Sequence, residues 1–314
     1  MKRREAATVM SLFTLGAMGA LVGLPGRARA QADDWRKRYP VVSFSSVSSE
    51  SQGATEARFK DFAKVFKERL GADLRIFTAT DYSGTIQALT SGQIQLAGLG
   101  PAAYATAWID SNGQVEPLAA AVEANGDLGY HASLIVKADS PYQKLEDLRG
   151  KTLAWADPNS TSGYLVPLVS LRAEGVEADK FFGRTAFSGG HEQSVIGVDK
   201  GSFNCAFVWT AKDPTQRGIL RAMTDRKLIE LKQFRVIWQS PVIPNSPLTV
   251  RKDLPAEMKR DITRLWTDLY SFDPKMAETL ARGKTLGYRP VTHEMYEPLL
   301  KVILEQRRNR NTAG

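Results

Sequence analysis

The segment Asp157-Pro-Asn-Ser-Thr-Ser-Gly-Tyr164 lies between an apolar run, 151–156, and a run with helical periodicity, 165–174. This order predicts a strand, a turn and a helix. Ser160, Thr161 and Ser162 then stand at the start of the helix, where four backbone N–H groups are unpaired and the helix dipole is positive. Such a position binds anions without Lys or Arg, although the commoner use of these residue types is to cap a helix.

The rest of the chain repeats this alternation. Runs with helical spacing, such as the apolar set from Phe59 to Leu70, separate runs that are rich in strand-forming residues. Strands that alternate with helices at this spacing predict an α/β fold with mostly parallel sheet. We expect strands at 41–46, 73–77, 94–99, 132–137, 151–156, 203–209 and 235–240, and we expect helices from Pro255 onward.

Further polar groups follow two of these strands and a later loop. Tyr82 and Tyr104 come after the second and third predicted strands, and His191 follows Gly189-Gly190. Ligands of α/β sheets bind at the carboxyl ends of the strands, so these residues are candidates for a binding site. A loop Tyr more often packs with its hydroxyl at the surface, whereas a His after two glycines can reach into a cleft and donate to an anion.

Residues 1–30 have the features of a signal peptide. Lys2-Arg3-Arg4 is followed by a mainly apolar run, 6–24, and by Ala28-Arg29-Ala30. An uncleaved anchor is the alternative, but the run is weakly hydrophobic for that role. This leader holds +4 of the formal charge of +8, which leaves +4 on the mature chain. We expect export to the periplasm, and the sequence leaves open whether the route is Sec or twin-arginine.

Composition and missing motifs exclude several classes of function. The chain is 43% hydrophobic and 24% charged, which is typical of a globular protein large enough for two domains. Its single Cys205 excludes an internal disulfide and a multi-Cys metal site, so we expect no cofactor and no metal. With three His, no H-E-x-x-H and no G-x-S-x-G, a hydrolase is disfavoured and we expect no enzyme. No basic stripe with interleaved aromatics indicates nucleic acid.

Six motifs follow one another along the chain, at 79–84, 100–104, 148–152, 157–164, 190–191 and 240–245. Together they resemble the periplasmic binding proteins of ABC importers for phosphate, phosphite and phosphonate. The resemblance covers nearly the whole mature chain. It implies an α/β fold of two lobes, a "Venus flytrap", with a ligand cleft and two crossover strands at the hinge, near 125–129 and 241–245. Lobe 1 is then 33–128 plus 243–314, and lobe 2 is 129–242.

The same resemblance implies which residues bind the ligand. Tyr82 and Tyr104 would wall the cleft from lobe 1, the hydroxyl turn 160–162 would hold the oxyanion from lobe 2, and His191 would reach it from the neighbouring loop. Neutral donors suit a tetrahedral anion because they desolvate more cheaply than a salt bridge.

One strand departs from the family pattern. Many relatives carry acidic or polar acceptors there, but Asn204 and Trp209 stand at the approximate positions in this chain, and whether Asn204, Cys205 or Trp209 faces the cleft is open. Without a carboxylate in the cleft, an aminophosphonate is disfavoured relative to phosphite or a methylphosphonate-like ligand.

The resemblance therefore implies a periplasmic protein that captures a phosphorus oxyanion and delivers it to an ABC permease in the inner membrane, and we expect it to be a monomer. The alternative is a sensory protein of the same fold that presents an oxyanion such as arsenite to a membrane histidine kinase. Related arsenite sensors use cysteine, which makes Cys205 the residue on which this alternative depends.

Overall fold

A computed structural model describes residues 34–47 and 49–312. The described residues from Trp35 onward form one compact unit. The predicted signal peptide, 1–30, lies outside the described residues. None of the described helices has the length and apolar character of a bilayer-crossing segment.

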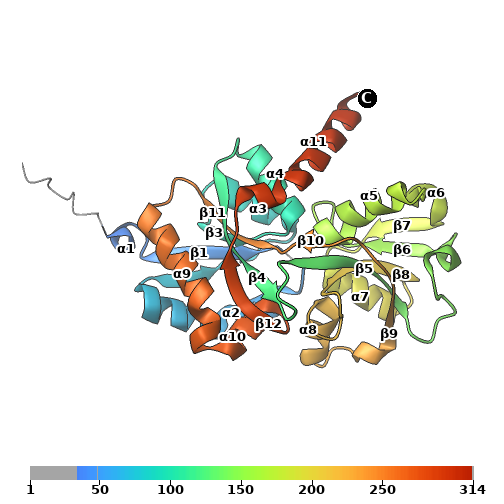
Figure 1. The fold of residues 1–314 in the computed structure, drawn as a ribbon, viewed down its shortest axis with the longest axis horizontal. Helices are drawn as coiled ribbons and strands as arrows, with labels where there is room; N and C mark the ends of the chain where they lie inside the picture. The colour runs from blue at the N-terminus through green and yellow to red at the C-terminus, as the bar shows by residue number, and fades with distance from the viewer. Residues whose placement is uncertain (1–33, 48, 313–314) are drawn as a thin grey trace, which may run out of the picture. The chain divides into compact units, whose positions relative to one another are not determined.

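The first sheet of this unit has six strands within the described residues (Figure 1). Their order is β12 (Thr285–Pro290), β4 (Val115–Glu123), β11 (Pro247–Arg251), β3 (Leu96–Gly98), β1 (Val41–Ser46) and β2 (Asp73–Ile76). β1 runs parallel to β2 and β3, whereas β11 is antiparallel to β3 and β4, and β12 is antiparallel to β4.

Helices cover both faces of this sheet. One face packs against α1 (Trp35–Arg38), α2 (Gln52–Leu70), α9 (Ala256–Phe272) and α10 (Pro274–Ala281), and the other against α3 (Tyr82–Thr90), α4 (Pro101–Asp110), the 3₁₀ turn η4 (His293–Tyr296) and α11 (Glu297–Thr312). On the first face the rings of Phe62 and Trp266 lie 4.7 Å apart. Neighbouring strand residues serve opposite faces, as Leu96 and Ala97 do.

The second sheet lies in the middle third of the chain. Among the described residues its order is β10 (Ile243–Pro244), β5 (Gly129–Lys137), β8 (Cys205–Thr210), β6 (Thr152–Trp155) and β7 (Arg184–Phe187), and β9 (Phe234–Gln239) also pairs with β5. α7 (His191–Asp199), α8 (Ile219–Asp225) and η3 (Leu231–Gln233) pack on one face, while η1 (Leu145–Leu148), α5 (Val166–Ala173) and α6 (Ala178–Phe181) pack on the other.

The chain passes between the sheets twice. It leaves the first sheet after β4 and enters the second at β5, and it returns between β10 and β11, as Figure 1 shows. The fold is thus the predicted α/β fold with two sheets. The lobe boundaries, 33–128 plus 243–314 and 129–242, remain a prediction.

Two details of the predicted fold are wrong. Both sheets are mixed rather than mostly parallel, because the strands beside the two passages run antiparallel to their neighbours. The region after Pro255 is not all helical, since β12 pairs with β4. Its sequence lacks strand-like alternation because Gly287, at φ 96°, and Pro290 interrupt it, and tertiary pairing supplies what local propensity does not.

Candidate ligand-binding site

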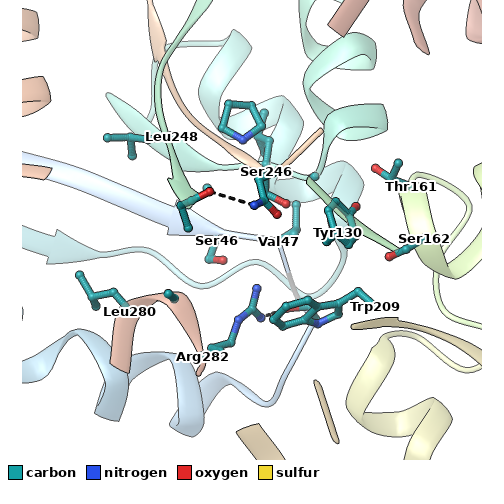
Figure 2. Close-up of a pocket in the computed structure, with 18 of the residues that line it drawn as sticks. Ser46, Val47, Tyr130, Thr161, Ser162, Trp209, Ser246, Leu248, Leu280 and Arg282 are labelled. Atoms are coloured by element: carbon teal, nitrogen blue, oxygen red, sulfur yellow. Dashed lines mark hydrogen bonds between the residues drawn. The ribbon is translucent and has the colours of Figure 1, made fainter. Parts of the chain in front are cut away.

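A cavity of about 120 Å³ opens at the carboxyl ends of parallel strands from both sheets. Figure 2 shows residues of both sheets around it, among them Ser46 at the end of β1, Tyr130 of β5 and Trp209 of β8. The hydroxyl turn 160–162, which follows β6, completes one side. This is the position at which α/β sheets bind their ligands.

The hydroxyl turn has an unusual backbone. Ser160 precedes a π-helical turn, η2 (Thr161–Leu165), in which the N–H of Leu165 donates to the carbonyl of Ser160 at 3.0 Å. The N–H of Gly163 donates to Ser160 Oγ, also at 3.0 Å. Single π turns are frequent at functional sites. Ser160, Thr161 and Ser162 are buried and line the cavity.

Four helical segments begin around the cavity. α3 begins at Tyr82, α4 at Pro101, η2 at Thr161 and α7 at His191. The first two belong to the first sheet and the last two to the second, and the N–H of Ala102 donates across to Thr161 Oγ1 at 2.8 Å. Each N-terminus has first-turn N–H groups without a partner in its own helix and a positive partial charge, so their convergence favours an anion.

His191 is a neutral member of the site. It is 3% exposed, and its Nε2 lies 3.2 Å from Ser160 Oγ. Burial, with a smaller contribution from the charge of Arg282, lowers the pKa of His191 to about 3. At neutral pH the imidazole is therefore uncharged, and it extends the set of neutral polar groups that begins at the turn.

The two predicted tyrosines lie in different places. Tyr82 lines the cavity, and burial raises the pKa of its phenol, which stays protonated. Tyr104 is not among the lining residues: its hydroxyl lies 2.8 Å from His293 Nδ1 and its ring packs on Tyr296 at 5.0 Å. Five of the six predicted ligand residues thus meet at the cavity, and Tyr104 packs in the core.

Sequence reasoning missed several lining residues. The phenol of Tyr130 joins the site from β5, and burial raises its pKa. Arg58, Arg217 and Arg282 reach the cavity from positions far apart in the chain. Trp209 also lines it, which answers one question that the sequence left open. No short motif marks these residues, since only the fold brings them together.

Asn204 and Cys205 have structural surroundings. Asn204 Oδ1 accepts from the N–H and from the hydroxyl of Thr152, both at 2.9 Å. Cys205 is fully buried, its Sγ lies 3.6 Å from the carbonyl of Thr152, and burial raises the pKa of the thiol. Neither residue lines the cavity, and the described residues contain no cluster of His, Cys, Asp and Glu suited to a metal ion.

Fold and cavity together define a solute-binding protein, and comparison with known proteins gives the family. The model of the family described as "ABC transporter, phosphonate, periplasmic substrate-binding protein" matches residues 44–296. The chain belongs to this family, which consists of transport binding proteins rather than enzymes. Membership implies a periplasmic location, a small ligand and a membrane permease as partner.

Individual relatives agree with this assignment. The chain is 33% identical over 288 residues to the phosphonates-binding periplasmic protein of Escherichia coli K12, covering 90% of this chain and 80% of that protein. It is 27% identical to the phosphate-import protein PhnD of Mycolicibacterium smegmatis, over 69% and 68% of the two chains. A binding-protein component of an ABC phosphonate transporter from Pseudomonas aeruginosa superposes with a TM-score of 0.74 at 27% identity, covering 88% of this chain and 89% of that one.

Proposed function

We propose that the chain captures a small phosphorus oxyanion, a phosphonate, phosphite or phosphate, and delivers it to an ABC permease in the inner membrane. The observation that carries this proposal is the convergence of four helical N-termini with buried hydroxyls at one cavity. The names of three relatives refer to phosphonate or phosphate. We also propose that residues 1–30 are cleaved on export and that the mature protein is a monomer.

Ligand binding is coupled to closure of the cavity between the two halves of the molecule, each of which contains one sheet. Contacts that cross the cavity include the Ala102–Thr161 hydrogen bond, a bond from Asn159 Nδ2 to Ser83 Oγ at 3.0 Å, and one from the N–H of Glu192 to the carbonyl of Ser49 at 3.1 Å. A ligand that touches both halves adds further contacts of this kind. It therefore favours the closed arrangement, which the permease then receives.

The ligand set follows from these positions. Ser160, Thr161 and Ser162 supply hydroxyls, Tyr82 and Tyr130 supply phenols, and His191 supplies a neutral imidazole. Arsenite sensing is disfavoured, because it needs a thiol in the cavity and Cys205 is buried outside the lining. We therefore expect Cys205→Ser to bind the phosphorus oxyanion with an unchanged Kd.

A ligand panel tests the proposal. Calorimetry and thermal melts of the purified protein are recorded with phosphate, phosphite, methylphosphonate, aminoethylphosphonate, sulfate and arsenite. A ligand at a hundredfold excess over its Kd stabilises the native state by ~2.7 kcal/mol. We expect at least one phosphorus oxyanion to bind and Thr161→Ala to weaken it about tenfold or more. Thr279→Ala, on the exposed side of α10, is the matched control. If no phosphorus compound binds, the proposal fails.

A further inference from the structure

The cavity contains one guanidinium that lacks a carboxylate partner. Arg58 Nε lies 2.8 Å from Glu50 Oε1, and Arg217 forms an ion pair with Glu123. Arg282 forms no ion pair with any described residue: its Nη1 donates to Ser49 Oγ at 2.6 Å, and its Nε is buried without a hydrogen-bond partner. Arg282 is half-buried, and the charge of Glu50 acts on it without a direct ion pair. Holding a guanidinium partly out of water without its own counterion is costly, so this charge needs an explanation.

The backbone of Arg282 adds to that cost. Arg282 is the C-cap residue that follows α10, and its backbone has φ 62° and ψ 49°, the left-handed conformation. Gly is the residue that normally fills this position at the end of a helix, since a side chain there is strained. Backbone strain at such a position, together with an unpaired charge, is typical of a functional residue rather than of a stabilising one.

Arg282 and the hydroxyl turn line the same cavity from different sides. Figure 2 shows Arg282 beside Trp209, with Thr161 and Ser162 elsewhere around the same space. The guanidinium carbon lies 4.6 Å from the centre of the Trp209 ring, which holds the group in place. Its charge contributes to the lowered pKa of His191, so the two sides are electrostatically coupled.

The two sides differ in charge. The turn, Tyr82, Tyr130 and His191 are neutral donors, whereas the Arg282 side has three guanidinium groups, those of Arg58, Arg217 and Arg282, against the carboxylates of Glu50 and Glu123. Burial, and then the charge of Arg58, lower the pKa of Arg282 to about 10, at which it remains protonated at neutral pH. Three guanidinium groups thus face two carboxylates on this side, so one of them has no carboxylate of its own.

We propose that the ligand carries a carboxylate on a short carbon chain beside its phosphonate, and that Arg282 binds this carboxylate. The inference rests on the proposed function, since it assigns the phosphonate to the hydroxyl turn. A carboxylate satisfies the free donors of Arg282 with the planar geometry that a guanidinium prefers. The cavity of about 120 Å³ limits the chain between the two anionic groups to one or two carbons. An ammonium group at the same place would be repelled by the positive charge of the Arg282 guanidinium.

Matched ligands test this inference. Kd values are measured by calorimetry for phosphonoacetate, ethylphosphonate and 2-aminoethylphosphonate, which have two-carbon skeletons that end in a carboxylate, a methyl group and an ammonium group respectively. We expect the Kd of phosphonoacetate to be about tenfold or more below that of ethylphosphonate, since a charge-assisted hydrogen bond supplies that factor. The aminated ligand binds more weakly than either.

Two groups of variants identify the residues. Arg282→Gln removes the advantage of phosphonoacetate and leaves ethylphosphonate within about threefold, whereas Thr161→Ala weakens both by a similar factor. Arg282→Lys keeps the positive charge but loses the planar guanidinium that binds a carboxylate bidentately, so it should retain part of the preference for phosphonoacetate. Arg282→Gly is the folding control, since glycine suits the left-handed backbone and the melting temperature should not fall.

The outcomes separate the two proposals. Equal Kd values for phosphonoacetate and ethylphosphonate in the parent protein overturn the inference and leave the proposed function standing. An equal loss of both ligands in Arg282→Gln also overturns it, because Arg282 then contacts the phosphonate. Failure of every phosphonate to bind overturns the proposed function, and this inference with it.

Discussion

Gly163 shows how a single residue fixes the geometry of the hydroxyl turn. A Cβ at this position would overlap the methyl of Ala156 and would lie 2.9 Å from both His191 Cε1 and Ser160 Oγ. The turn can therefore sit against the end of β6 and against His191 only if residue 163 has no side chain. Overpacking of this kind typically costs about 1–3 kcal/mol.

We expect Gly163→Ala to lower the free energy of unfolding by about 1–3 kcal/mol and to weaken ligand binding, because it displaces Ser160 and His191 together. Denaturant unfolding and calorimetry measure the two effects. The control is Gly53→Ala in α2, where nothing lies within 4 Å of the new Cβ and helix propensity favours alanine. Gly163→Ala with unchanged stability and Kd would show that the turn tolerates displacement.

His191 should make stability depend on pH. Its pKa is about 3 in the folded protein and about 6.5 in the unfolded chain, so the unfolded state binds the extra proton between these values. The stabilisation that neutral His191 adds to the free energy of unfolding is complete above pH 6.5 and is lost as the pH falls toward 3. Relative to His191→Gln, the parent protein should lose ~2 kcal/mol between pH 7 and pH 5, measured by denaturant unfolding at both values. Parallel pH profiles for the two proteins would contradict this.

At the residue scale, the sequence predicted what is encoded locally. Ser160, Thr161, Ser162 and His191 stand in short motifs at helix starts, and each lies at the cavity. Arg282 could not be found in this way, because an arginine near a helix end is ordinary and its strained backbone is invisible in the sequence. Tyr104 also follows a predicted strand, but it lies in α4 and packs on Tyr296, because a position after a strand is common to packing and binding residues alike.

At the scale of the element, β12 depends on a contact that no local pattern encodes. Thr285 is 2% exposed, and its hydroxyl donates to the carbonyl of Val122 in β4 at 2.6 Å. The N–H of Gly287 donates back to the same hydroxyl at 3.1 Å. This side chain thus satisfies backbone groups of both strands where the register shifts.

We expect Thr285→Val, which keeps the shape but removes the hydroxyl, to lower the free energy of unfolding by about 1–3 kcal/mol, because two buried backbone groups lose their partner. Chemical denaturation checks the value. Thr279→Val at the exposed surface of α10 serves as the comparison. A difference below about 0.5 kcal/mol between the two variants would mean that water or backbone shifts replace the lost bonds.

Elements with local periodicity, such as α2 and β1, were predictable, whereas β4 and β12 were not. β4 is rich in alanine and contains Pro117, so its composition does not favour a strand. β12 carries Gly287 and Pro290. Both acquire their structure by pairing, β4 with β11 and β12, and β12 with β4.

At the scale of the whole molecule, a buried network joins the two passages between the sheets. Arg217 pairs with Glu123, the last residue of β4, and its Nη1 lies 3.3 Å from Asn245 Oδ1, just after β10. Asn245 Nδ2 in turn donates to Glu123 Oε1 at 2.9 Å. The two segments that connect the sheets are therefore held to each other.

We expect Glu123→Gln to destabilise the protein by about 3–5 kcal/mol, because it leaves Arg217 buried without its counterion, and to shift the free protein away from the closed arrangement. Unfolding curves and small-angle scattering with and without ligand measure the two effects. Glu116→Gln is the control, since the Glu116–Lys259 pair is partly exposed and should contribute ~0–1 kcal/mol. Equal effects in both variants would show that the network does not hold the hinge.

The order of the strands also sets the order in which the chain can complete its sheets during synthesis. β11 lies between β3 and β4, so the first sheet stays in two pieces until residue 251 has been made. Every strand of the second sheet, from β5 to β10, precedes that point in the chain. Residues from the C-terminal part of the chain are thus needed to complete the sheet that forms first. A ribosome that stalls before β11 leaves both edges of β4 unpaired, because β11 and β12 are its two neighbours, and unpaired edges of this kind can pair with other chains.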